Sequence, residues 1–141
     1  MCSSDLLSKL THLIYCFGNL VGDEFRLRGP SDSAAVQKLI GLKKSFPHLK
    51  VMLSLGGWGG CATCSDVFSR TEGRKRFAES VRATADYFHV DGLDLDWEYP
   101  VVQGFPGHPR SPDDKRNFTL LLEEIRRESA DDFLLTFASG G

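Results

Sequence analysis

Residues 91–99 read DGLDLDWEY, an apolar stretch with an acidic side chain at every second position after Gly92. Successive side chains of a β-strand point to opposite faces, so Asp94, Asp96 and Glu98 would share one face. The positions between them are apolar: Leu93, Leu95 and Trp97. Three carboxyl groups gathered on one side of a strand that is otherwise built for burial indicate a functional site.

The chain repeats one unit, an apolar run followed by a helical pattern. The apolar runs cover residues 11–20, 50–57, 91–99 and 133–141. Their starts, near 11, 51, 91 and 133, are 40, 40 and 42 residues apart. Strands and helices that alternate in this way predict an α/β protein with parallel strands joined by helical crossovers.

Helical spacing of apolar side chains predicts helices over 31–46 and 71–88 and a third helix that begins at SPDD, residues 111–114. Ser31 or Ser33 can cap the first helix, and Ser111 can cap the third. The predicted buried stripes are Val36, Leu39, Ile40 and Phe46; Phe77, Val81, Ala85 and Phe88; and Phe118, Leu121, Leu122 and Ile125.

Parallel βα units form either an open doubly wound sheet or a closed (β/α)₈ TIM barrel. The G-x-G-x-x-G turn of dinucleotide-binding sheets does not follow the first strand. Barrel enzymes carry their chemistry at the C-terminal ends of the strands, where Glu98 falls. Because a barrel needs roughly 250 residues and eight strands, the 141 residues predict a partial barrel of about four parallel strands and three helices.

The composition is that of an ordinary globular domain, with 41% hydrophobic residues, a net charge of −2 and a pI near 6.1. This charge predicts no nucleic-acid partner, and no apolar run approaches the roughly 20 residues of a membrane span. Residues 1–6, MCSSDL, match one reading frame of a common sequencing-adapter end. We therefore interpret 1–6 as a non-native extension and 7–141 as the domain; the alternative is a disordered polar terminus.

Paired acids suggest glycoside hydrolysis, in which one carboxyl group protonates the leaving oxygen. Crowding would raise at least one carboxyl pKa, as an acid catalyst requires. The alternative is a solvated strand face, which disagrees with a strand flanked by helices. Since Asp96 and Glu98 project from one strand to the same side, Asp96 is poorly placed as a nucleophile opposite Glu98. The nucleophile must come from elsewhere.

These residues carry a resemblance to glycoside hydrolase family 18, the chitinase family. DGLDLDWEYP resembles its D-G-x-D-x-D-x-E signature, and SLGGW, residues 54–58, resembles its S-x-G-G motif. THLIYCFGN resembles the family's second strand, GFPGHPRSPDDKRNFTLLLEEIR the helix after the catalytic strand, and LLTFASGG the fifth strand. The resemblance is collinear over residues 8–141 and implies that the strands are the second to fifth of a barrel.

The resemblance implies substrate-assisted catalysis, in which the 2-acetamido oxygen of the sugar is the nucleophile. Glu98 would then be the general acid and later the base. Asp96 would hold the acetamido N–H, and Asp94 would support Asp96. Asp91 has the opposite parity and would be structural, as would the other motif residues Gly92, Ser54 and Gly56.

Weaker roles also follow from the resemblance. Phe17 and Tyr99 match positions on the floor of the sugar site, and Gly57 lets the backbone lie close beneath the substrate. Trp58 and Phe105 could stack on sugar rings, with simple packing as the alternative.

The family's first strand, its sixth-strand tyrosine and its last-strand tryptophan have no counterpart in these residues, so we expect little turnover from the isolated chain. By resemblance, the substrate is chitin or its N-acetylglucosamine oligomers, no cofactor is needed, and the full-length parent is a secreted monomer.

Cys61 and Cys64 form a single C-x-x-C, which lacks the second ligand pair of a zinc site. We predict a local disulfide there, with free thiols as the alternative, and place Cys16 in the core. The histidines are scattered, so no metal site is predicted: His12, His48, His89 and His108.

Two rival functions stay open. A non-hydrolytic, lectin-like relative would normally lose the acid, whereas Glu98 is present. An endo-β-N-acetylglucosaminidase acting on N-glycans would share family and acid. The Tyr99-Pro100 pair and the loop over 104–112 look more like the chitinase branch.

Overall fold

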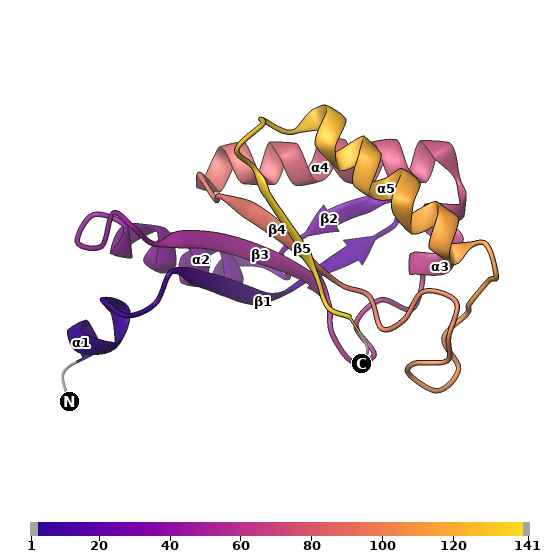
Figure 1. Cartoon of the computed structure of the whole chain (residues 1–141), viewed down its shortest axis with the longest axis horizontal. Coiled ribbons are helices and arrows are strands. Elements are labelled where there is room, and N and C mark those ends of the chain that lie inside the picture. The colour runs from indigo at the N-terminus through magenta and orange to yellow at the C-terminus, as the bar shows by residue number, and fades with distance from the viewer. Residues whose placement is uncertain (1–2, 140–141) are drawn as a thin grey trace.

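In the computed structural model of the protein, residues 3–139 are described. The elements are α1 (Ser3–Leu7), β1 (His12–Val21), β2 (Glu24–Arg26), α2 (Pro30–Leu42), β3 (Lys50–Gly56), α3 (Cys64–Ser69), α4 (Thr71–Phe88), β4 (Gly92–Asp96), α5 (Asp114–Glu128) and β5 (Leu134–Phe137). The strands form one sheet in the order β2-β1-β3-β4-β5, and α4 and α5 lie side by side along it (Figure 1).

The four predicted strands are confirmed as β1, β3, β4 and β5, each parallel to its neighbour. Together with the three predicted helices, now α2, α4 and α5, they make up part of a (β/α)₈ barrel. The sheet is open because β2 and β5 each pair with one strand only among residues 3–139. The predicted extension over residues 1–6 stays a prediction, since residues 1 and 2 lie outside the described part and Ser3 already begins α1.

Three elements were missed from the sequence. The short helices α1 and α3 lack a full apolar stripe, and β2 has only three residues. β2 returns antiparallel to β1 through the two-residue turn Gly22-Asp23, with Gly22 at a φ of 59°. Phe25 of β2 is buried against Gly18, where any Cβ atom would collide with its ring.

The predicted serine cap of the first helix is wrong. That helix begins at Pro30, with Gly29 at the N-cap and no side-chain cap. Proline suits the first helical turn because its missing N–H would have no partner there. The side chain of Asp32 instead accepts the Arg28 N–H at 3.2 Å.

The third helix starts at Asp114, three residues after the predicted cap. Ser111 Oγ accepts the Asp113 N–H at 3.2 Å, while the Asp114 carboxylate accepts the Ser111 N–H at 2.7 Å. These two hydrogen bonds lie before the helix, whose N-cap is Asp113 with no side-chain cap. The predicted cap at Ser111 is therefore wrong, because Ser111 holds the turn that leads into the helix and not the helix's own first N–H groups.

A chain of edge-to-face aromatic contacts runs through the core between sheet and helices. It passes from Phe25 to Phe77, Phe68, Trp97 and Phe118, with ring centroids 5.1–6.3 Å apart. Edge-to-face pairs add roughly 0.5–1.5 kcal/mol beyond area burial. The chain links β2, α4, α3 and α5 to Trp97, directly after β4.

Asp91, directly before β4, is hydrogen-bonded to residues of α2's C-cap and of β3. Its carboxylate accepts hydrogen bonds from Lys43 Nζ at 2.6 and 2.8 Å and from the Val51 N–H at 2.8 Å. Although burial opposes it, the Lys43 hydrogen bond helps to lower the pKa of Asp91. Asp91 therefore secures the start of β4 against β3.

Within residues 3–139, no helix combines the length and the hydropathy that a membrane crossing requires.

We expect Phe77→Ala to reduce the free energy of unfolding by about 3–5 kcal/mol, since it leaves a cavity where two aromatic contacts meet. The matched control is Lys75→Ala on the exposed side of α4, for which we expect a change within about 0.5 kcal/mol. Denaturant unfolding of a complete barrel containing this segment measures both; equal losses would contradict the assigned core.

Candidate active site at the carboxyl ends of the strands

Asp94, Asp96 and Glu98 lie on the side of the β4 segment that faces away from the helices. Leu93, Leu95 and Trp97 are buried on the helix side, and the acids between them are partly buried. The predicted alternation of buried apolar and partly buried acidic side chains is therefore confirmed. Its cause is the apolar core between the strand and the helices.

Asp94 is clamped by hydroxyl groups from both neighbouring strands. Ser54 Oγ of β3 donates to Asp94 Oδ2, and Thr136 Oγ1 of β5 donates to Asp94 Oδ1, each at 2.7 Å. The strand register places the three residues directly beside one another. Sequence reasoning named Ser54 but missed Thr136, whose only signal was its position in the fourth apolar run.

Asp96 and Glu98 each keep one carboxyl oxygen that is buried and without a hydrogen-bond partner in the described part of the chain: Asp96 Oδ1 and Glu98 Oε2. Burial, and then the charge of Asp94, raises the pKa of Asp96. Burial, and then the charge of Asp96, raises the pKa of Glu98. The acids thus form a sequence in which each carboxylate favours protonation of the next.

The backbone after β3 lies directly against the acidic strand. Gly56 and Gly57 have positive φ angles of 110° and 78°. The Gly57 N–H donates to the Asp96 carbonyl oxygen at 2.9 Å, and a Cβ atom on Gly56 would collide with that oxygen. The Phe17 ring packs against Gly57, so the structure brings together Phe17, the two glycines and Asp96. The peptide bonds Cys16–Phe17 and Glu98–Tyr99 are cis.

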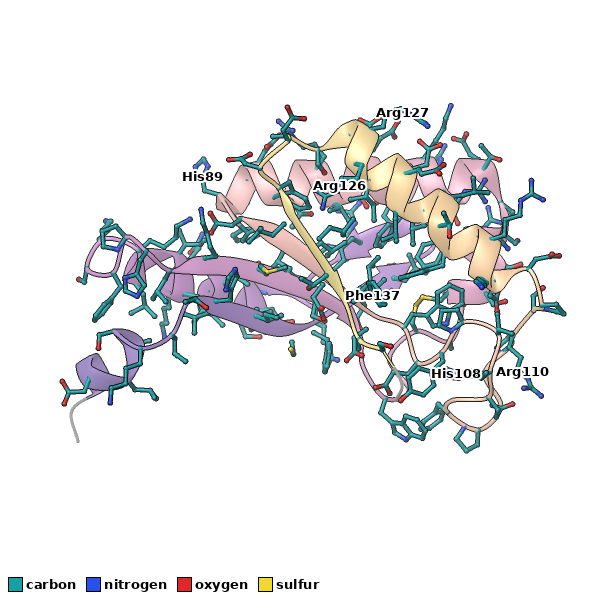
Figure 2. The ribbon with its side chains drawn as sticks, in the orientation of Figure 1. His89, His108, Arg110, Arg126, Arg127 and Phe137 are labelled. Atoms are coloured by element: carbon teal, nitrogen blue, oxygen red, sulfur yellow. A yellow bond between two sulfur atoms is a disulfide. The ribbon has the colours of Figure 1, made fainter. Side chains whose placement is uncertain are left out.

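The loops after β3 and β4 meet through exposed aromatic rings. Trp58 is 62% exposed and lies edge-to-face with Phe105, with ring centroids 5.8 Å apart. His108, which Figure 2 labels on the loop after β4, lies 4.9 Å from the Phe105 ring. Because Trp58 is largely exposed, simple core packing does not account for it, and its predicted stacking role stays a prediction.

Tyr99 borders a groove that the three acids do not line. The groove has a volume of about 940 Å³, and its walls include Trp97, Phe118 and Phe137. The structure therefore does not group Tyr99 with Phe17, and its role in the sugar site also stays a prediction.

Within residues 3–139, the three cysteines are a bonded pair and one free thiol. Cys61 and Cys64 are joined in a disulfide and are buried where the β3 loop enters α3. The prediction that Cys16 belongs to the core is wrong, because its side chain is exposed. It lies on the uncovered face of the sheet, where the charges of Asp94 and Asp96 add to partial burial in raising its pKa.

In residues 3–139, no three or more His, Cys, Asp or Glu side chains gather as a metal ion would need. The chemistry available to the described residues is that of carboxyl groups: proton donation, proton acceptance and hydrogen bonding to an amide. Carboxyl groups at the C-terminal ends of parallel βα strands lie where barrel enzymes carry their chemistry.

Comparison with known proteins defines the family. The family described as "Glycosyl hydrolases family 18" matches residues 3–141, and the chain belongs to it. Chitinase A1 of Niallia circulans is 40% identical over 112 residues, which cover 74% of this chain and 16% of that protein. "Probable chitinase 2" of Drosophila melanogaster is 36% identical over 141 residues, a match that covers 92% of this chain and 28% of that protein.

Among solved structures, the chitinase domain of the spore coat protein CotE from Clostridium difficile is similar, with a TM-score of 0.82 and 32% identity. That match covers 94% of this chain and 37% of the other. The chain therefore spans well under half of the relatives it matches.

We expect Asp96→Asn to stabilise the fold in a pH-dependent way. Because the folded state raises the pKa of Asp96 above its ordinary 3.8, the native side chain costs stability as pH rises through that folded pKa. Well below pH 3.8 the carboxyl group is protonated in both states and the cost disappears. Melting temperatures of the variant and wild type should therefore converge as pH falls to about 2.5 and diverge by about pH 7.5.

The control for this variant is Asp131→Asn, which removes an exposed carboxyl group. Its melting temperature should follow that of the wild type at both pH values. An Asp96→Asn advantage that is equal at both pH values would contradict the electrostatic origin.

Proposed function

We propose that this segment supplies the acid of an enzyme that hydrolyses β-1,4-linked N-acetylglucosamine polymers, chitin and its oligomers. The observation that carries the proposal is the pair of buried, unpartnered oxygens, Asp96 Oδ1 and Glu98 Oε2. Buried carboxyl oxygens are normally hydrogen-bonded, so this pair suits a polar ligand. The names of the chitinase relatives support the polymer.

In the first step, protonated Glu98 donates its proton to the glycosidic oxygen as the bond to the anomeric carbon breaks. The 2-acetamido oxygen of the same sugar attacks that carbon from the other face and forms an oxazolinium ion. In the second step, water attacks the anomeric carbon, Glu98 takes the water's proton, and the acetamido group is released. Two inversions retain the configuration.

Asp96 orients the acetamido group by accepting its N–H, and its negative charge stabilises the oxazolinium ion. Asp94 acts through Asp96 as a positioning residue. Both Asp94 oxygens already accept hydroxyl hydrogens, from Ser54 and Thr136. These two hydrogen bonds fix the position of the Asp94 carboxylate, whose charge helps to raise the pKa of Asp96.

The sequence of raised pKa values matches this division of labour. Glu98 must hold a proton when substrate binds, and both burial and the charge of Asp96 help it to do so. The rate should therefore fall as pH rises through the pKa of Glu98.

We expect Glu98→Gln, in a complete barrel containing this segment, to reduce hydrolysis of chitin oligomers by about 10²–10⁴-fold. Glutamine retains the size of the side chain but cannot donate a proton to the leaving oxygen, so oligomer binding should persist. Release of reducing ends and isothermal titration with an oligomer measure the two quantities.

Glu79→Gln, on the exposed face of α4, is the matched control and should leave turnover unchanged. A Glu98→Gln variant that still hydrolyses oligomers would sink the acid assignment. Wild-type protein that binds oligomers without turnover would instead favour the lectin-like alternative. Cleavage of a glycoprotein's N-glycans in preference to chitin oligomers would favour the endo-β-N-acetylglucosaminidase.

We further expect the 141-residue chain by itself to show little or no turnover. Its four parallel strands leave the acid face without the strands that close a barrel, and Thr136 lies on an outer strand. A chromogenic chitobiose substrate offered to the purified chain tests this. Rates typical of complete family members would contradict it.

The proposal extends to export of the full-length protein and action as a monomer. A polymer too large to enter cells must be cleaved outside them, and the Cys61–Cys64 disulfide suits an oxidising compartment.

A further inference from the structure

Asp114 is the only fully buried acid in the part of the chain that the structure describes, with 0% of its surface exposed. It is the first residue of α5, sixteen positions after Glu98. A buried carboxylate is costly unless hydrogen bonds compensate it. Its partners therefore indicate what it does.

Three segments donate hydrogen bonds to this carboxylate. Ser65 Oγ of α3 donates to Asp114 Oδ1 at 2.7 Å. The Ser111 N–H donates to Oδ2 at 2.7 Å, and the Val101 N–H donates to the same oxygen at 3.4 Å. Asp114 thus joins the loop that follows Glu98 to α3 and to the start of α5.

The loop that follows Glu98 needs such support. Val101 has a φ of 70°, a left-handed conformation that is sterically unfavourable for a β-branched residue. Such a conformation persists only where surrounding contacts hold it. Three residues on, Gly104 lies so close to the Glu98 carbonyl oxygen that a Cβ atom would collide with it. The loop therefore folds back onto the backbone of Glu98.

Through Ser65, the Asp114 carboxylate also contacts the end of the loop that follows β3. Ser65 directly follows Cys64 of the disulfide, at the end of the loop that carries Trp58. Trp58 in turn contacts Phe105 of the loop after β4. The buried Asp114 carboxylate therefore connects the loops that follow β3 and β4, which also meet at the surface through Trp58 and Phe105.

We propose that Asp114 is a positioning residue for Glu98: it holds the loop over 99–104 in the conformation that aims the Glu98 carboxyl group at the leaving oxygen. This inference rests on the proposed function, since it needs Glu98 to be the acid. The competing explanation is that Asp114 only holds the turn before α5, for which the contact with the Ser111 N–H would suffice. That explanation does not require the contacts with Val101 and Ser65.

The two explanations predict different rate losses for substrates with different leaving groups. An aryl glycoside releases a weakly basic phenolate that needs little protonation, whereas an unmodified oligomer releases a sugar alkoxide that needs the acid. A misplaced Glu98 therefore slows the oligomer far more than the aryl substrate. A general loss of folded protein slows both equally.

The experiment uses a complete barrel that contains this segment. We expect Asp114→Ala to lower kcat for an N-acetylglucosamine oligomer by about 10²-fold, the cost of misplacing a reacting group by about 1 Å. The loss on a 4-nitrophenyl substrate should be below about tenfold, because little of the acid's contribution is at stake there. KM should change little for either substrate.

Asp114→Asn is the conservative variant. Its amide oxygen can still accept the Ser111 and Val101 N–H groups while its NH₂ donates to Ser65 Oγ. We expect it to restore oligomer turnover to within about tenfold of wild type. Asp113→Asn removes the neighbouring exposed carboxyl group and should behave as wild type.

Equal losses on both substrates in folded Asp114→Ala, or wild-type turnover of the oligomer, would overturn the proposal. If Asp114→Ala does not fold, Ser65→Ala provides the test of the proposal. This variant removes one hydrogen bond to Asp114 and leaves the carboxylate in place. It should lose severalfold more on the oligomer than on the aryl substrate; an equal effect on both overturns the proposal. Glu98→Gln, measured in parallel, reports separately on the acid: if it retains turnover, the proposed function itself is wrong.

Discussion

The burial of Trp97 is the constraint on which the rest of the site depends. Its ring lies edge-to-face between Phe68 of α3 and Phe118 of α5, with the helices on one side of the sheet. In an extended chain, neighbouring side chains must then point to the other side. Asp96 and Glu98 are consequently held on the face away from the helices. The direction of the acids thus follows from the free energy of burying an aromatic side chain, without a contact to the acids themselves.

Electrostatics then distinguishes three acids that begin as near equals. Asp94 has two hydroxyl donors, whereas Asp96 and Glu98 each keep a buried oxygen without a partner. The charge of Asp94 helps to raise the pKa of Asp96, and the charge of Asp96 helps to raise that of Glu98. Each effect adds to burial. The result is two carboxyl groups, those of Asp96 and Glu98, whose protonated states are favoured relative to a carboxyl group in water.

The loops after β3 and β4 hold the backbone around Asp96 and Glu98 in place. Glycines at 56 and 57 let the β3 loop approach the Asp96 backbone, and Gly104 lets the β4 loop return to Glu98. Asp114 connects those loops beneath the surface, and the Trp58–Phe105 pair connects them above it. Of the two open edges of the sheet, β2 is separated from β4 by β1 and β3, whereas β5 pairs directly with β4 and supplies Thr136. The acid and its supports are therefore assembled within the segment, although the barrel is partial.

The sequence by itself determined the parallel βα repeat, the face on which the acids lie and the family, because these depend on period-two and period-3.6 patterns and on local motifs. It could not determine Thr136 as a partner of Asp94, the exposure of Cys16, the hairpin of β2 or the hydrogen bonds of Asp114. These features depend on the register between strands, whose partners lie up to 42 residues apart, and on which faces of the sheet the helices cover. Only the tertiary structure decides them, since hydrogen bonding and burial are properties of neighbours in space, and no local pattern records which neighbours will meet.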